Sequence, residues 1–155
     1  MAKEQDLMKL YSGRILALAA AIPLTERLQN AQATVRKRSP LCGSTVEVDV
    51  DMADGRIIAY GQDVKACALG QTAASILGAH VLGLSKQQIT TGRDQLFAML
   101  KENGAPPDAP FEDLEVLLPA RDYANRHASI MLAFNATLEA IDIIEKTLQT
   151  NRLQR

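Results

Sequence analysis

The sequence predicts an α+β fold in which helices pack on one face of a small three-stranded antiparallel sheet. Three observations lead to this class: an early alternating segment, a β-hairpin signal directly after it, and helical periodicity through most of the remaining chain. The length of 155 residues fits a single domain spanning residues 1–155. The last residues, 149–155, are polar, and we expect this tail to fray.

The hairpin is the clearest local signal in the sequence. Residues 45–51 alternate apolar and polar side chains with period two, and the Asp-Gly pair at 54–55 is typical of a tight turn. The segment that follows, residues 56–64, supplies the return strand. Residues 31–36 also alternate, which predicts a third strand before the hairpin.

Helical periodicity covers most of the remaining chain. The helix that begins after Ser85 is marked by a capping box, Ser-Lys-Gln-Gln, and Gly104 is a suitable cap at its other end. The predicted helices cover residues 5–22, 68–82, 86–103, 111–117 and 119–148.

Composition and charge exclude several classes of function. Seventeen Lys and Arg against eighteen Asp and Glu give a net charge of -1, and aromatic residues are scarce, so we expect no nucleic-acid partner. The sequence shows no signal peptide and no apolar run of about 18 residues, so we expect a cytoplasmic protein with no membrane partner. Motifs of hydrolases and phosphate-binding loops are absent, so we do not expect an enzyme.

The two cysteines are predicted neighbours in space. If Asp51 faces Arg56 across the hairpin, then Cys42 and Cys67, 25 residues apart in the sequence, both lie at the open end of the hairpin. An error of one or two residues in this register leaves both at the same end.

The sequence around each cysteine favours a role as a metal ligand or nucleophile over a role as a buried core residue. Cys42 lies in a Pro-Leu-Cys-Gly loop, where Gly43 allows a ligand to approach the backbone. Cys67 lies at the start of a predicted helix, where the helix dipole favours the thiolate, the form that binds metals. The alternative is that each is a small buried hydrophobic residue.

The chain has only two histidines, His80 and His127, as it has only two cysteines. His127, in the last helix, is a candidate third ligand because imidazole suits iron and zinc, and the alternative is a surface or capping residue. His80 lies on an apolar helix face and reads as a core or edge histidine.

Four segments together carry a resemblance to a known family: Tyr11-Ser-Gly-Arg-Ile15, Pro40-Leu-Cys-Gly43, Cys67-Ala-Leu-Gly-Gln-Thr-Ala-Ala-Ser75 and Arg126-His-Ala-Ser129. With these segments in this order, the chain resembles the iron–sulfur cluster assembly scaffold proteins, which include the NifU N-terminal domain, IscU and SufU. The long stretch after Cys67, with Gly92-Arg93 and a proline-rich loop, is closest to the SufU-type branch. The resemblance implies a SufE/NifU-like fold.

The chain departs from the family pattern at three places. The acidic residue two positions after the first cysteine is replaced by Ser44. The third cysteine is missing: one alignment puts Ala128 in its place, and another puts Ser129 there. The Leu-Pro-Pro-Val-Lys chaperone motif of the IscU branch is absent, with Leu118-Pro-Ala-Arg121 as a partial echo.

The resemblance implies a scaffold or accessory protein that binds iron, zinc or a nascent Fe–S cluster and transfers the cluster or its sulfur. The implied ligands are Cys42, Cys67 and His127, with Ser44, Ser129 and Asp122 as additional candidates. The site is incomplete in one chain, and a homodimer sharing two cysteines from each copy is another route to four thiolates. The implied partners are a cysteine desulfurase and apo Fe–S acceptor proteins.

Two other functions remain open. In the first, the chain accepts sulfur from a desulfurase as a persulfide on Cys42 or Cys67, without a cluster, in a sulfurtransferase-like accessory role. In the second, it is an interaction protein that kept the fold and lost the metal site.

Overall fold

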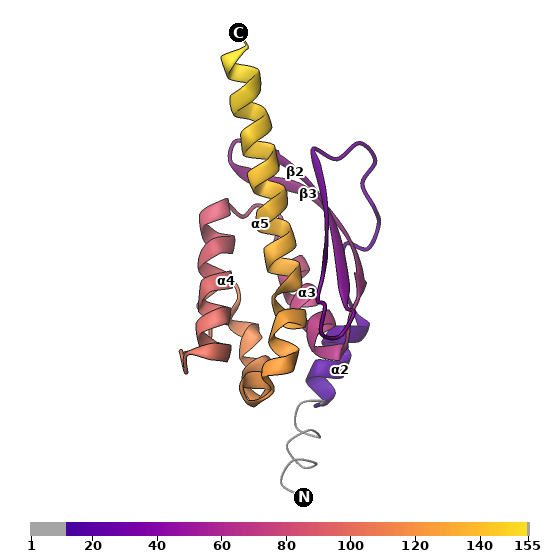
Figure 1. Ribbon diagram of the computed structural model, residues 1–155, viewed down its shortest axis with the longest axis vertical. Helices are drawn as coiled ribbons and strands as arrows, with labels where there is room; N and C mark the ends of the chain where they lie inside the picture. Colours follow the sequence, from indigo (N-terminus) through magenta and orange to yellow (C-terminus); the bar gives the residue numbers. More distant parts are fainter. Residues whose placement is uncertain (1–11, 155) are drawn as a thin grey trace, which may run out of the picture.

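The structure is a computed structural model that describes residues 12–154 (Figure 1). The chain forms one antiparallel sheet with strand order β1-β2-β3, followed by helices, which confirms the predicted α+β class. The elements in chain order are α2 (Gly13–Ala20), β1 (Ala33–Arg38), β2 (Thr45–Ala53), β3 (Arg56–Lys65), α3 (Ala68–His80), α4 (Lys86–Lys101), the 3-10 helix η1 (Glu112–Asp122) and α5 (Ala124–Leu153).

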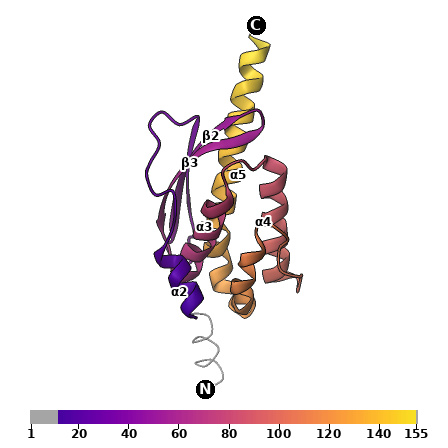
Figure 2. The same cartoon turned by 180° about the vertical axis from the view of Figure 1, so that it is seen from behind.

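The long helix α5 runs through the middle of the molecule. The sheet lies on one side of α5 and α4 on the other, in the front view and in the view from behind (Figures 1 and 2). The inward side chains of β2, Val46, Val48 and Val50, are fully buried beneath this helix. Alternation along β2 therefore directs its apolar face to the core, as the sequence pattern predicts.

The hairpin forms where it was predicted, with a different register. The turn residues Asp54 and Gly55 both have positive φ, 51° and 75°, as a tight hairpin turn requires. Arg56 pairs with Ala53 rather than Asp51, and an irregularity after Asp51 shifts the rest of the ladder. The predicted register was therefore wrong by two residues at the turn, because the loop is the two-residue Asp54-Gly55 and not four residues long, and the bulge adds one more residue beyond Asp51.

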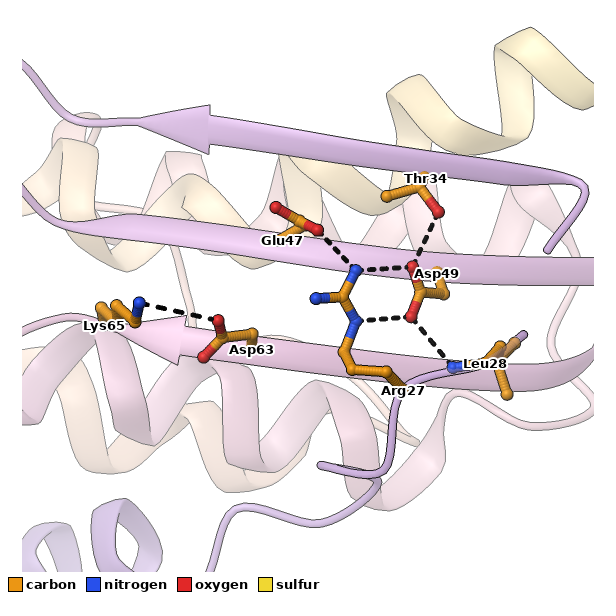
Figure 3. Close-up of polar contacts among 7 residues, drawn as sticks. All are labelled: Arg27, Leu28, Thr34, Glu47, Asp49, Asp63 and Lys65. Carbon is orange, nitrogen blue, oxygen red and sulfur yellow. Dashed lines mark hydrogen bonds and ion pairs between the residues drawn. The ribbon is translucent and has the colours of Figure 1, made fainter. Parts of the chain in front are cut away.

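The outer face of the sheet is covered by the segment between α2 and β1. From this segment Arg27 makes two hydrogen bonds to Asp49 on β2, Nε to Oδ2 at 2.6 Å and Nη2 to Oδ1 at 2.8 Å (Figure 3). The hydroxyl of Thr34 and the backbone N–H of Leu28 also donate to this carboxylate, at 2.7 and 3.1 Å. Asp49 is only 1% exposed, and the hydrogen bonds from Arg27 hold the pKa of its carboxyl below the usual value despite burial.

Helix boundaries differ from the prediction at both ends of the last helix. Residues near Pro119 belong to η1, and α5 begins only at Ala124, because Tyr123 has non-helical backbone angles (φ −119°, ψ 73°) that interrupt the helix. At the other end, α5 continues past the predicted Leu148 to Leu153, since no glycine or proline intervenes. Residues 149–153 are exposed, and fraying of the tail stays a prediction.

The other helices lie close to their predicted ranges. The capping box at Ser85 is present, with the hydroxyl accepting from Gln88 N–H. The short helix predicted over 111–117 is a longer 3-10 helix, 112–122. The first part of the helix predicted over 5–22 lies outside the described residues.

In the part of the chain that the structure describes, one helix is long and apolar enough to cross a membrane by length and composition. This helix is α5, and 72% of its most apolar window is buried inside the protein. This helix packs against the sheet and α4, so its apolar side chains form the centre of the protein core.

Candidate functional site

Three separate elements converge at the open end of the hairpin. Cys42 comes from the loop between β1 and β2, Cys67 is the N-cap residue of α3, and Ser129 lies in the second turn of α5. The loop is closed by backbone hydrogen bonds from Ser39 N–H to Ser44 C=O and from Gly43 N–H to Ser39 C=O, both 2.8 Å. Gly43 has a φ of 72°, which explains why glycine suits this turn.

A chain of hydroxyl groups joins the two thiols. Cys42 Sγ lies 3.1 Å from Ser44 Oγ, Ser44 Oγ accepts from Ser129 Oγ at 3.1 Å, and Ser129 Oγ lies 3.5 Å from Cys67 Sγ. Ser39 Oγ is 3.4 Å from Cys42 Sγ on the other side. We call these five residues the thiol–serine cluster. The cysteines thus share one site, although their sequence positions are far apart.

The cluster favours the thiolate form of Cys42. Hydrogen bonding with Ser39, which is the largest cause, and with Ser44 lowers the pKa of the Cys42 thiol from 9.0 to about 7. With this pKa, a large fraction of the Cys42 thiol is ionised at neutral pH, and the thiolate is the nucleophilic form. Because Cys42 is exposed, this thiolate can reach a partner. The two serines are buried and hold their hydroxyls in place.

The reaction of Cys42 with iodoacetamide should therefore follow a titration with a midpoint near pH 7, because only the thiolate reacts. The rate should fall as the pH falls through that value, since protonation removes the nucleophile. Ser39→Ala should move the midpoint upward, whereas Ser85→Ala, at the cap of α4, should not. Mass spectrometry of the Cys42 peptide measures the rate, and a midpoint above pH 8 in the wild type would contradict the prediction.

His127 lies apart from the thiol–serine cluster. It is 3% exposed, its Nε2–H donates to the carbonyl of Ala120 at 2.8 Å, and its Nδ1 accepts from the Lys101 ammonium at 3.2 Å. Both ring nitrogens are therefore engaged. Among residues 12–154, no three His, Cys, Asp or Glu side chains form a group that could hold a metal ion.

The additional candidates separate into two groups. Ser44 and Ser129 are buried members of the cluster, whereas Asp122 is an exposed residue at the end of η1. The sequence left open whether Ala128 or Ser129 stands at the place of the missing cysteine, and the structure puts Ser129 beside Cys67. Sequence reasoning missed Ser39, although its position three residues before Cys42 in a Pro-Gly turn was an available signal.

Close packing of α3 on α5 depends on Gly70. A Cβ atom at this position would lie 2.6 Å from Ser129 Oγ and 3.1 Å from Ser129 C=O, closer than real contacts allow. The glycine therefore lets the first turn of α3 approach Ser129, which in turn places Ser129 next to Cys67.

Gly70→Ala should lower the free energy of unfolding by about 1–3 kcal/mol, because the added methyl group overpacks this interface. It should also separate Ser129 from Cys67. Urea denaturation followed by circular dichroism measures the change in stability. Gly13→Ala, at a position with nothing within 4 Å, is the matched control and should cause no loss. Equal stability of Gly70→Ala and the wild type would contradict the close packing.

A search of solved structures finds a strong match over nearly the whole chain. The N-terminal part of a nitrogen-fixing NifU-like protein from Brucella abortus is 38% identical, with a TM-score of 0.89, and the alignment covers 91% of this chain and 98% of that one. The chain belongs to the NifU-like N-terminal family. This confirms the resemblance found in the sequence and the fold that it implied.

More distant structures share the fold of this NifU-like chain. One is a hypothetical protein with 21% identity and a TM-score of 0.77, matched over 86% of this chain and 97% of that one. Another, from Fervidobacterium islandicum AW-1, was solved as a candidate iron–sulfur cluster assembly scaffold for the SUF system, with 17% identity, a TM-score of 0.73 and coverage of 84% and 94%. No family model and no curated protein matches the NifU-like chain.

Proposed function

We propose that this NifU-like protein acts in iron–sulfur cluster assembly, as a scaffold or accessory protein whose two thiols receive iron, sulfur or a nascent cluster. The observation that carries the proposal is the thiol–serine cluster, which brings Cys42 and Cys67 together from different elements. Membership of the NifU-like family and the fold shared with a candidate SUF scaffold support it.

The two cysteine ligands suit iron or a cluster that is bound and later released to another protein. Thiolates are the ligands that iron and iron–sulfur clusters prefer, and Cys42 is exposed. Serine hydroxyls are weaker ligands, so one chain supplies two strong ligands where a closed tetrahedral site needs four. We infer that the remaining positions are taken by sulfide, by a partner or by a second copy of this chain.

Anaerobic reconstitution with ferrous iron and sulfide tests the proposal. The wild type should gain iron and acid-labile sulfide together with a visible chromophore, and Cys42→Ala and Cys67→Ala should each lose them. Ser85→Ala is a control that leaves the thiols intact. A wild-type protein that retains neither metal nor sulfide at any ratio of protein to iron would contradict cluster binding.

A second candidate function is a persulfide carrier that holds no cluster. The lowered pKa and the exposure of Cys42 favour it, because such a thiolate is a ready nucleophile at neutral pH. The Cys42 thiolate would attack the outer sulfur of a persulfide on a cysteine desulfurase. A new S–S bond forms on Cys42, the donor S–S bond breaks, and the donor cysteine leaves as a thiolate, so no external oxidant is needed.

Mass spectrometry after incubation with a cysteine desulfurase and cysteine separates the two functions. A persulfide carrier gains one sulfur atom on Cys42 without iron, and Cys42→Ala does not. Absence of both the persulfide and the cluster would leave the interaction protein as the remaining alternative. In either active role the protein would work in the cytoplasm, with apo Fe–S proteins as final acceptors.

A further inference from the structure

A basic groove lies directly beside the loop that carries Cys42. It has a volume of about 680 Å³ and runs between that loop, α4 and α5. Ser39, Pro40 and Leu41 form the wall nearest to Cys42. Ser39 also contacts the Cys42 sulfur, so the groove reaches the edge of the thiol–serine cluster.

Among residues 12–154, four cationic side chains line the groove, and two of them pair with a carboxylate. Lys37 lies 3.7 Å from a carboxylate oxygen of Glu139, and Arg93 pairs with Asp94 at 2.8 Å. Arg38 and Lys101 also line the groove, and within the described part of the chain neither forms an ion pair with a carboxylate. The groove therefore presents two cationic side chains, Arg38 and Lys101, that have no carboxylate partner within residues 12–154.

Lys101 is held in place rather than free to move in solvent. Its ammonium donates to Nδ1 of buried His127 at 3.2 Å and lies 5.8 Å from the centre of the Phe97 ring. Nε2 of His127 donates to the carbonyl of Ala120, and Nδ1 is the ring nitrogen that accepts from the Lys101 ammonium. Buried His127, which is not part of the thiol cluster, thus serves to position a cation at the wall of the groove.

Apolar side chains are exposed beside these charges. Leu41, next to Cys42, is 75% exposed and Phe97 is 41% exposed, and both line the groove. Large apolar residues flanked by unpaired cations are typical of surfaces that bind a protein segment with the complementary pattern. A single small anion would not explain the apolar side.

We propose that this groove, between Arg38, Lys101 and the Cys42 loop, docks an acidic segment with apolar side chains that belongs to the protein delivering sulfur to Cys42. The occupant follows from charge complementarity with Arg38 and Lys101 and from the exposed Leu41 and Phe97. The link to sulfur delivery rests on the proposed function, because the groove ends at the thiol that would receive the sulfur. Docking here would bring the partner's reactive cysteine to the exposed face of Cys42.

Direct binding tests the groove without reference to sulfur chemistry. The probe is a short fluorescein-labelled peptide rich in glutamate with two leucines, measured by fluorescence anisotropy, with a lysine-rich peptide of the same length for comparison. The acidic peptide should bind, and Arg38→Glu and Lys101→Glu should each weaken it about tenfold. Binding should also weaken as salt rises. Lys146→Glu, the same charge change far along α5, should have no effect.

Desulfurase-dependent sulfur transfer tests the link to Cys42. With subsaturating NifU-like protein, Arg38→Glu and Lys101→Glu should slow persulfide formation on Cys42 about tenfold, and a high protein concentration should restore the rate. Lys101→Gln should show an intermediate loss, because it removes the charge without reversing it. Circular dichroism confirms that each variant is folded.

The outcomes separate the docking proposal from the proposed function. If the charge reversals change neither peptide binding nor transfer while Cys42→Ala abolishes transfer, the docking proposal is overturned and the function stands. If the wild type accepts no sulfur but binds the acidic peptide through Arg38 and Lys101, the groove stands and its role in sulfur delivery is overturned. Equal binding of acidic and basic peptides overturns the charge argument.

Discussion

Ser129→Cys is expected to convert a labile two-thiolate site into one that retains iron. The hydroxyl of Ser129 lies 3.5 Å from Cys67 Sγ and 3.1 Å from Ser44 Oγ, so a sulfur at this position joins the two existing thiols. Gly70 leaves room for the sulfur, since no Cβ atom projects toward residue 129 from that position. Losing a supporting contact around a metal costs about 10–100-fold in affinity, and we expect a gain of at least this size from a third strong ligand.

Iron and sulfide content after anaerobic reconstitution measures the gain, together with the rate of iron loss to a chelator. Ala128→Cys is the matched control. It adds the same thiol one residue earlier, at an exposed position that lines the basic groove instead of the cluster, and should bring no gain. If Ala128→Cys and Ser129→Cys retain iron equally well, the cluster geometry has no part in binding.

Asp49→Ala is expected to lower the free energy of unfolding by about 2–3 kcal/mol. The carboxylate is 1% exposed and accepts hydrogen bonds from Arg27, Thr34 and the backbone of Leu28 (Figure 3). Removing one member of a buried charge pair costs about 3–5 kcal/mol. The Arg27 side chain is 40% exposed and regains water, which lowers the expected loss.

Urea denaturation of Asp49→Ala and Asp63→Ala compares a buried carboxylate with an exposed one. Asp63 lies on the neighbouring strand of the same sheet and pairs only weakly with Lys65, at 3.9 Å (Figure 3). Its removal should change stability by less than about 0.5 kcal/mol. Similar losses in both variants would mean that the Arg27 contacts do not hold the segment on the sheet.

The Asp49 effect should also depend on pH. Hydrogen bonds from Arg27 lower the pKa of this carboxyl in the folded protein below its ordinary value of 3.8. A lowered folded pKa means that the stabilisation is complete above about pH 4 and is lost as the pH falls through the folded pKa. The stability difference between the wild type and Asp49→Ala should therefore be constant near neutral pH and shrink below about pH 4.

Much of the fold could be predicted because its signals are local. Alternation along residues 45–51 and the Asp-Gly turn identify the hairpin, and the Ser85 capping box marks the start of α4. The outer cover of the sheet could not be predicted, because Arg27 and Asp49 are distant in sequence and each reads as an ordinary surface charge. The same holds for the bulge after Asp51, which has no sequence signature here.

The site could be predicted in part for the same reason. Pairing across the hairpin places Cys42 near Cys67, since strand register carries information over 25 residues. The sequence cannot show which residue of the Arg126–Ser129 segment faces them, because that depends on how α5 is rotated against α3. Residues 127 and 129 are both buried, yet Ser129 contacts Cys67 whereas His127 contacts Lys101.

The continuous helix α5 also sets a fixed distance between the thiol–serine cluster and the far end of the molecule. It carries Ser129 in its second turn and Lys146 near its far end, and with a rise of 1.5 Å per residue these positions are about 26 Å apart along one axis. A fluorophore on residue 146 would therefore sit at a fixed distance from the thiols without touching the groove or the cluster. Energy transfer from that position to a labelled partner would report where on the molecule each delivery protein binds.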